Sequence, residues 1–227
     1  MNVQIGARAN RESEGIDVSR HNCSPPKRPI DWTAVRAAGI EWAYARATLG
    51  AVGVDPTFAV NWAGAQAAGL AVGAYHLYIT GLNPHSQSAN FLKALNGDWG
   101  QLAPVLDVEP RDGEIILDKR PITEGIRIWL ADVERETGKR PMIYTNNPAW
   151  SALTTLPDWA ADYPTWLARY GPHEPVLPEP WKSSGKPWTI WQYTAAGDVA
   201  GIDGRVDRNR FRPRLETGAA QQAATRI

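Results

Sequence analysis

Two carboxylates lie two residues apart in the stretch APVLDVEP (residues 103–110), which otherwise has the apolar composition of a buried strand. Side chains at positions i and i+2 point to the same face of a strand, so we expect Asp107 and Glu109 side by side, about 7 Å apart at the backbone. Crowded carboxylates repel each other, and their pKa values separate until one acts as an acid and the other as a base. The spacing therefore indicates acid–base chemistry.

Two other interpretations of this acid pair remain open at this point. The carboxylates could bind a divalent metal, or they could form a structural pair with basic partners. No His or Cys lies close to them in the sequence, which disfavours a metal, and we predict neither a metal nor a cofactor. His76 is expected to be a hydrogen-bonded core histidine rather than a base. Cys23, the single cysteine, is expected to be a structural thiol rather than a nucleophile paired with His21.

The elements that must position the acids alternate between strands and helices. Apolar runs predict strands over 15–22, 40–48, 70–79, 103–110 and 140–146. Helices are predicted over 30–39, 55–69, 83–96 and 123–138, the last three capped by Asp55, Asn83 and Thr123. Beyond a short helical stretch at 147–153, three further strands are predicted over 164–170, 188–194 and 204–211. This order favours an α/β fold with parallel strands and right-handed crossovers in a closed or nearly closed barrel.

A closed barrel would bring four acids together. Active sites of such barrels lie at the C-terminal ends of the strands. Asp107 and Glu109 close the fourth predicted strand, Asp17 belongs to the first, and Asp207 to the last. First and last strands are neighbours in a closed barrel, so the four side chains are expected around one mouth, an arrangement typical of glycosidases.

The length and the charge balance are typical of a single soluble domain. The chain has 227 residues, and its 24 basic residues balance its 24 acidic ones, so no overall charge favours nucleic acid or an anionic membrane. We predict a polar leader (1–14), a single barrel domain (15–212) and a disordered tail (213–227). The sequence shows neither a secretory signal nor a run of about 18 apolar residues, so we expect synthesis in the cytoplasm and no integral membrane segment.

Eight motifs, in this order, resemble the glycoside hydrolase family 25 lysozymes, which are muramidases: GIDVSRHN, YARATLG, GLAVGAYHLY, PVLDVEP, ETGKRPMIYTNNPAW, TWLARY, WTIWQYT and GIDGRVDRNRF. The resemblance runs from about Gly15 to Phe211. It implies an irregular TIM-like barrel of five βα units followed by three β elements, which cleaves the β-1,4 bond between N-acetylmuramic acid and N-acetylglucosamine in peptidoglycan. Two features depart from the family: YARATLG lacks the acidic residue often found after its Thr, and no wall-binding repeats follow the barrel.

The resemblance also implies site residues. Glu109 matches the general acid and Asp107 its partner, while Asp17 and Asp207 match the acids of the first and last strands. Six further residues fall where the family places its cleft: Tyr75, Tyr144, Trp166, Trp191, Gln192 and Tyr193. The chain contains 11 Trp residues, and flat aromatic faces bind sugars, so Trp166 and Tyr144 are expected to stack on the glycan.

The expected mechanism gives each acid a task. Glu109, flanked by Asp107 and an aromatic wall, is expected to stay protonated, and Asp107 to stay ionised in a more polar position. The 2-acetamido group of the substrate can attack the anomeric carbon, with retention, while Asp107 orients it and Asp17 and Asp207 hold the site. Two other functions remain possible: an inactive peptidoglycan-binding barrel, and a glycosidase acting on chitin-like chains. We expect a monomer that binds peptidoglycan strands and reaches the wall by holin-type release, as in a bacteriophage endolysin.

Overall fold

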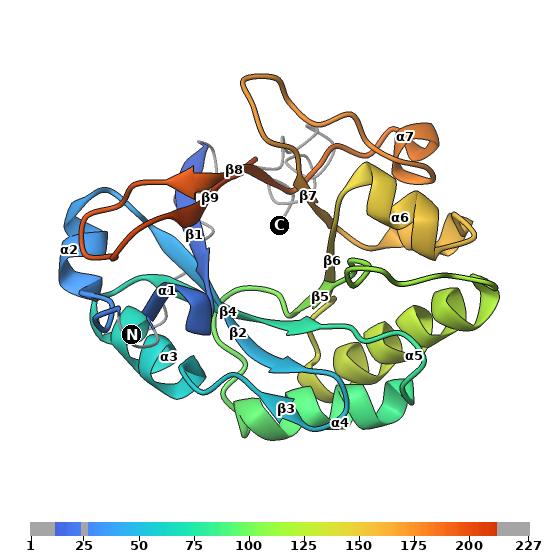
Figure 1. Cartoon of the computed structure of the whole chain (residues 1–227), viewed down its shortest axis with the longest axis horizontal. Coiled ribbons are helices and arrows are strands. Elements are labelled where there is room, and N and C mark those ends of the chain that lie inside the picture. Colours follow the sequence, from blue (N-terminus) through green and yellow to red (C-terminus); the bar gives the residue numbers. More distant parts are fainter. Residues whose placement is uncertain (1–11, 24–26, 213–227) are drawn as a thin grey trace, which may run out of the picture.

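The computed structural model describes residues 12–23 and 27–212, in which strands and helices alternate before a final run of strands (Figure 1). The strands are β1 (Ser13–Val18), β2 (Trp42–Leu49), β3 (Gly53–Val54), β4 (Ala71–Leu77), β5 (Val105–Asp107), β6 (Met142–Thr145), β7 (Thr165–Ala168), β8 (Ile190–Gly197) and β9 (Val206–Phe211). The helices are α1 (Arg20–Cys23), α2 (Trp32–Ala37), α3 (Phe58–Ala67), α4 (Pro84–Leu95), α5 (Arg120–Thr137), α6 (Asn147–Leu153), α7 (Trp181–Ser184) and the 3₁₀ helix η2 (Asp158–Asp162).

The strands close into the predicted barrel. The hydrogen-bonded order is β1-β9-β8-β7-β6-β5-β4-β2-β3, and a further pairing of β1 with β2 closes the ring, leaving β3 outside it. Neighbours from β1 through β2 and β4 to β8 are parallel, whereas β9 runs antiparallel to both β8 and β1. The α/β fold class is thus confirmed. The short β3, which forms a hairpin with β2, was not predicted.

Two apolar layers fill the fold. The ring encloses a mainly aromatic core of Trp42, Tyr44, Val105, Met142, Tyr144, Trp166 and Ile190. Glycines make room for these rings: a Cβ on Gly15 would lie 2.1 Å from the Trp42 ring, and one on Gly73 would lie 2.2 Å from Tyr44. A larger apolar cluster is formed by residues of the strands and of the helices, which surround the barrel in Figure 1. Helix α5 contributes a stripe of Ile126, Trp129, Leu130 and Val133, all fully buried.

Helix ends agree with the sequence at most positions. Asn83 caps α4 by accepting a hydrogen bond from the backbone N–H of Ser86, and Gly138 ends α5 in the left-handed conformation. Two predicted N-caps are wrong. Asp55 does not cap α3, because that helix begins after Thr57 and the Asp55 carboxylate is bound to Arg46 instead. Thr123 lies inside α5, which begins one turn earlier.

The described strands of the barrel begin at Ser13 and end at Phe211. Strand β1 begins at Ser13, so Ser13 and Glu14, placed in the polar leader by the sequence analysis, belong to the barrel. Strand β9 ends at Phe211. The rest of the predicted leader, up to residue 11, and the predicted tail, 213–227, lie outside the described residues. None of the described helices is both long and apolar enough to cross a membrane.

Candidate active site

Asp17 and Asp207 face each other across neighbouring strands. They are direct partners in the register of β1 and β9. Asp17 is near the C-terminal end of β1, whereas Asp207 is the second residue of β9. Because β9 is antiparallel, its N-terminal end reaches the mouth where the parallel strands place their C-terminal ends. The reversed strand therefore brings the two acids together.

Three hydrogen bonds involve the Asp17 carboxylate. Its Oδ2 accepts from the Asn209 Nδ2 at 2.8 Å and from the Gln192 Nε2 at 3.0 Å, and the carboxyl shares a third hydrogen bond with Asp207. Burial raises the pKa of Asp17, and these hydrogen bonds oppose that effect. For Asp207, burial and the charge of Asp17 raise the pKa to about 8. The pair thus holds one proton, which we place on Asp207, with the charge on Asp17.

A second layer of polar groups fixes the residues that bind Asp17. The Oε1 of Gln192 accepts hydrogen bonds from the hydroxyls of Tyr144 at 3.0 Å and Tyr170 at 3.1 Å. The indole N–H of Trp166 donates to the Oδ1 of Asn209 at 2.8 Å. Both amides are therefore held in one orientation, with their N–H groups directed at Asp17.

Asp107 ends β5 and is the most isolated of the four acids. Its side chain is 9% exposed, and its Oδ1 is buried without a hydrogen-bond partner among the described residues. Burial raises the pKa of Asp107 well above its usual value, and the charges of Glu109 and Asp17 add to the rise, whereas Arg46 opposes it. An unpartnered buried oxygen is costly, and such groups are often reserved for a ligand.

Glu109 lies two residues further out, at the rim of the mouth, and is only partly buried. Burial raises its pKa, the charge of Asp17 raises it further, and a hydrogen bond from Asn146 at 3.3 Å lowers it. Glu109 thus has the raised pKa expected of an acid. The expectation that Asp107 occupies the more polar position is wrong, because Asp107 points into the barrel while Glu109 lies beyond the end of the strand.

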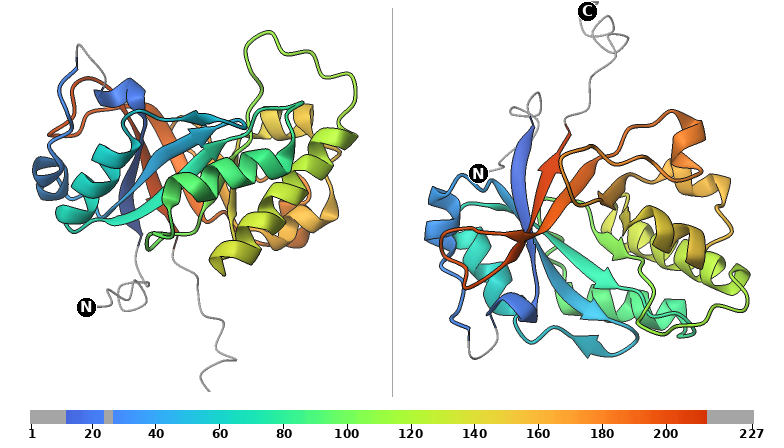
Figure 2. Two further views of the ribbon diagram at one scale, coloured as in Figure 1. Left: turned by 90° about the horizontal axis from the view of Figure 1, so that it is seen from below. Right: turned by 45° about the horizontal axis from the view of Figure 1, so that its top comes forward.

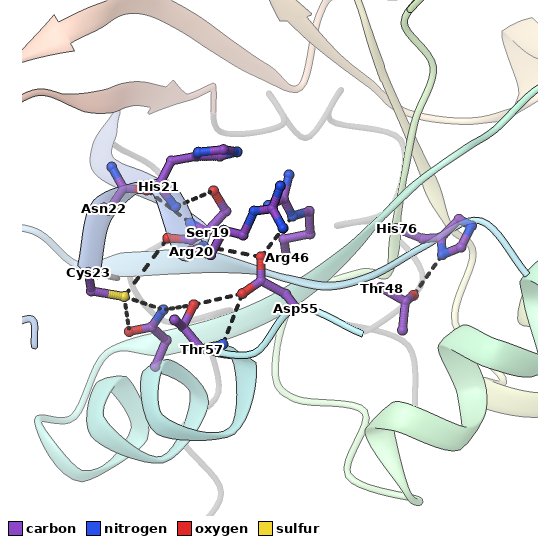
Figure 3. Close-up of polar contacts among 11 residues, drawn as sticks. Ser19, Arg20, His21, Asn22, Cys23, Arg46, Thr48, Asp55, Thr57 and His76 are labelled. Atoms are coloured by element: carbon purple, nitrogen blue, oxygen red, sulfur yellow. Dashed lines mark hydrogen bonds and ion pairs between the residues drawn. The ribbon is translucent and has the colours of Figure 1, made fainter. Parts of the chain in front are cut away.

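Arg46, which forms a buried ion pair with Asp55, places a positive charge near the acids. The Nε of Arg46, on β2, lies 2.8 Å from the Oδ2 of Asp55, and their side chains are 11% and 0% exposed. Figure 3 shows Asp55 also accepting hydrogen bonds from Thr57 and from the backbone N–H of Arg20. The pair ties together three segments of the mouth: the start of α1, strand β2 and the start of α3.

The predicted cleft residues separate into two groups. Tyr75, Tyr144 and Gln192 lie with the acids: the charges of Asp17, Asp107 and Asp207 all raise the pKa of Tyr75, although burial raises it most. Trp191 and Tyr193 lie on the opposite face of β8, because side chains alternate along a strand. Their polar atoms donate to the Arg169 carbonyl at 2.7 Å and to Glu14 at 2.7 Å.

Trp166 lies beneath the acids rather than beside a groove. It is 1% exposed and packs against Tyr44 and Tyr144 in the barrel core. Tyr144 is 9% exposed. A ring as enclosed as that of Trp166 offers no face to a sugar, and its role in this structure is to hold Asn209.

The two residues expected to be structural have the predicted surroundings. His76 is fully buried, hydrogen-bonded to Thr48 at 2.6 Å and to Gln87 at 3.3 Å, and burial lowers its pKa to about 4 (Figure 3). Cys23 is half-buried, and its Sγ lies 3.6 Å from the Asn61 Oδ1. Across 12–23 and 27–212, no three His, Cys, Asp or Glu side chains are grouped so that they could hold a metal ion.

Four polar residues near the acids were not predicted: Arg46, Asn146, Tyr170 and Asn209. Three of them follow a recognised residue at a spacing of two or four, which on a strand places them on the same face: Asn146 after Tyr144, Tyr170 after Trp166, and Asn209 after Asp207. The same alternation could have found them and could have excluded Trp191 and Tyr193.

A mainly parallel barrel with four carboxyl groups at one mouth has the features of a glycoside hydrolase. Residues 16–202 match the model of the family described as glycosyl hydrolases family 25. The chain therefore belongs to this family.

Individual relatives agree with that assignment. The chain is 33% identical over 217 residues to Lysozyme M1 of Streptomyces globisporus, covering 91% of this chain and 70% of that protein. It is 26% identical over 221 residues to the N,O-diacetylmuramidase of Chalaropsis sp, covering 90% of this chain and 99% of that protein. Among solved structures, the bacterial lysozyme from Streptomyces coelicolor superposes with a TM-score of 0.75 at 30% identity, covering 93% of this chain and 95% of that one.

Proposed function

We propose that this glycoside hydrolase is a peptidoglycan muramidase, which cleaves the β-1,4 bond between N-acetylmuramic acid and N-acetylglucosamine. The names of its relatives, a lysozyme and an N,O-diacetylmuramidase, support the substrate class. The observation that carries the proposal is the pair formed by Asp107 and Glu109, in which Asp107 keeps an unpartnered oxygen and Glu109 has a raised pKa.

In the proposed first step, Glu109 is the general acid. Its raised pKa favours the protonated form, and the proton passes to the glycosidic oxygen as the bond from that oxygen to the anomeric carbon breaks. The carbonyl oxygen of the substrate's own 2-acetamido group forms the new bond to that carbon. Glu109 leaves this step as a carboxylate and then accepts a proton from the water that opens the cyclic intermediate, with net retention.

Asp107 acts on the acetamido group in this mechanism. The Asp107 carboxyl keeps hydrogen-bonding capacity that no described residue uses, which suits the acetamido N–H, and accepting that hydrogen bond would stabilise the Asp107 carboxylate. The nearby charge of Arg46 favours the same ionised form. Positive charge develops on the acetamido nitrogen during ring closure, so a carboxylate at this position stabilises the transition state more than the ground state.

Asp17 and Asp207 hold the site in the proposed mechanism. The three hydrogen bonds to Asp17 fix the charge that raises the pKa of Glu109. This role needs no contact with the sugar.

The decisive experiment replaces Glu109 with Gln, which keeps the shape of the side chain and removes the proton. We expect an intact melting temperature and a loss of roughly 10²- to 10⁴-fold in the rate of glycan release from purified peptidoglycan. A loss below about tenfold would exclude Glu109 as the general acid.

Comparing substrates tests the two other functions. The wild-type protein is expected to release reducing ends from peptidoglycan much faster than from chitin oligomers. Faster release from chitin would identify a chitin-type glycosidase, and binding of peptidoglycan without release would identify an inactive barrel.

We also propose that the protein works as a monomer, does not bind nucleic acid and reaches the wall after holin-type release. Light scattering of the purified chain should give a mass near 24.9 kDa. Expression in a bacterial host should cause lysis only when a holin is expressed with it. Lysis without a holin would contradict the release route.

A further inference from the structure

Asn146 follows β6 and faces Glu109 across neighbouring strands. Asp107 and Tyr144 are partners in the parallel register of β5 and β6, and two residues further along each chain lie Glu109 and Asn146. Two hydrogen bonds hold these chain ends together: the Val108 N–H donates to the Tyr144 carbonyl, and the Thr145 hydroxyl donates to the Val108 carbonyl, both at 2.9 Å. The position of Asn146 beside Glu109 is therefore fixed by the backbone.

The orientation of the Asn146 amide is fixed as well. Asn146 is the N-cap of α6, and its Oδ1 accepts a hydrogen bond from the Ala149 N–H at 2.9 Å. Exchanging the two ends of the amide would set N–H against N–H, so the cap forces the Nδ2 to face the other way. There it donates to the Oε1 of Glu109 at 3.3 Å.

This contact has a consequence for the acid. Within 12–23 and 27–212 it is the one hydrogen bond that the Glu109 carboxyl makes. A carbonyl oxygen is a better acceptor than a hydroxyl oxygen, so the hydrogen bond to Oε1 favours the acid form of Glu109 that carries its proton on Oε2. We propose that Asn146 is a positioning residue that, through the cap of α6, holds the Glu109 carboxyl with its Oε2 proton directed at the glycosidic oxygen. The inference rests on the proposed role of Glu109 as general acid.

A purely structural role for Asn146 can be separated from a positioning role. Asn83 caps α4 in the same way, with its Oδ1 accepting from the Ser86 N–H at 3.1 Å, and it has no part in the proposed mechanism. Serine is as good an N-cap as asparagine but has no amide N–H. Asn146→Ser therefore keeps the cap and removes the donor, and Asn83→Ser is the matched control.

Steady-state rates on soluble peptidoglycan fragments, measured across pH, test the proposal. Asn146→Ser is expected to lower kcat by about 10- to 100-fold with little change in KM. The hydrogen bond lowers the pKa of Glu109, so its loss should move the alkaline limb of kcat/KM upward, by about half to one pH unit. Asn83→Ser should change neither kcat nor the limb, and both variants should melt within a few degrees of the wild type.

A second variant guards against a folding failure. Asn146→Asp also keeps the cap, removes the donor and places a negative charge beside Glu109, so it should move the alkaline limb further upward than Asn146→Ser does. If both Asn146 variants match Asn83→Ser in kcat and in pH profile while Glu109→Gln is inactive, the positioning role is overturned and the role of Glu109 stands. A fully active Glu109→Gln variant would overturn both.

Discussion

The two acid pairs at the barrel mouth are built in opposite ways. Asp17 accepts hydrogen bonds from Asn209 and Gln192 and shares another with Asp207, so Asp17 has its polar partners within the protein. Asp107 keeps an oxygen without a hydrogen-bond partner. Among the described residues, the carboxyl of Glu109 accepts one hydrogen bond, from Asn146.

This difference suggests that one acid pair supports the site and that the other takes part in the reaction. A carboxylate that already has hydrogen-bond partners within the protein has little to gain from a ligand. A carboxyl oxygen without a partner can gain a hydrogen bond when a ligand arrives. In the proposed mechanism, the first pair stabilises the site before substrate binds, and the second pair is completed by the substrate. Each of the following experiments tests that division.

Among these experiments, the largest effect is expected at Asp107. Asp107→Asn removes the charge that we place beside the acetamido group, so kcat should fall by about 10²- to 10³-fold. Its melting temperature should equal or exceed that of the wild type, because a neutral amide costs less to bury than a charge. Thermal melts and muropeptide release measure the two quantities. Full activity in this variant would show that the open pair is not needed as proposed.

Trp166 belongs to the supporting network through Asn209, and its replacement should affect stability first. Trp166→Ala should cost about 3–5 kcal/mol of unfolding free energy, because the ring fills the barrel core. Trp166→Phe keeps most of the volume and should cost about 1–3 kcal/mol through the lost hydrogen bond to Asn209. Denaturant titration gives both values. A stable Trp166→Ala variant with weakened glycan binding would instead support a stacking role.

The proton on Asp207 predicts a specific pH dependence. A folded-state pKa of about 8, against an ordinary value of 3.8, means that the folded protein holds a proton that the unfolded chain releases between these values. The contribution of this group to stability is therefore complete below about pH 4 and is lost as the pH rises to about 8. Relative to Asp207→Asn, the wild type should lose at least about 1.4 kcal/mol over that window.

Asp203 provides the control for the pH experiment. Its bond to Arg28 lowers its pKa to about 2, so the difference between the wild type and Asp203→Asn should stay constant from pH 5 to 8. If the Asp207→Asn curve runs parallel to the wild-type curve as well, the two acids do not share a proton.

The smallest effect is expected from removing divalent metals. If the open pair is completed by a sugar, excess EDTA should leave the rate of muropeptide release unchanged. Inhibition by EDTA that is reversed by one divalent cation would assign the unpartnered Asp107 oxygen to a metal instead.

Much of this site follows from the alternation of side chains along strands. That rule predicted Asp107 with Glu109 and, together with barrel closure, the approach of Asp17 to Asp207. It was not applied to residues 191–193, where only Gln192 faces the acids. The prediction that Asp107 lies in more polar surroundings than Glu109 was wrong, because burial depends on where a short strand ends. Strand β5 stops at Asp107, so Glu109 extends toward solvent.

The amide partners were harder to predict. Asn209 and Gln192 reach Asp17 from two other strands, and Asn146 reaches Glu109 from β6. Which side chains meet across a barrel depends on the stagger of every pair of strands, and the sequence alone does not determine that stagger. Likewise, Asp55 has the local pattern of a helix cap, but a tertiary ion pair with Arg46 takes its carboxylate.

The antiparallel pairing of β9 with β1 also decides how this barrel can be joined to other modules. Ser13 and Phe211 are direct register partners, so the described barrel begins and ends at adjacent points, beneath the acids and at the far end of both strands (Figure 2). A fusion at either point would leave from the side opposite the substrate. A short linker between the two points could close the chain into a circle, and new ends could then be opened in an exposed loop, giving a permuted enzyme with its site intact.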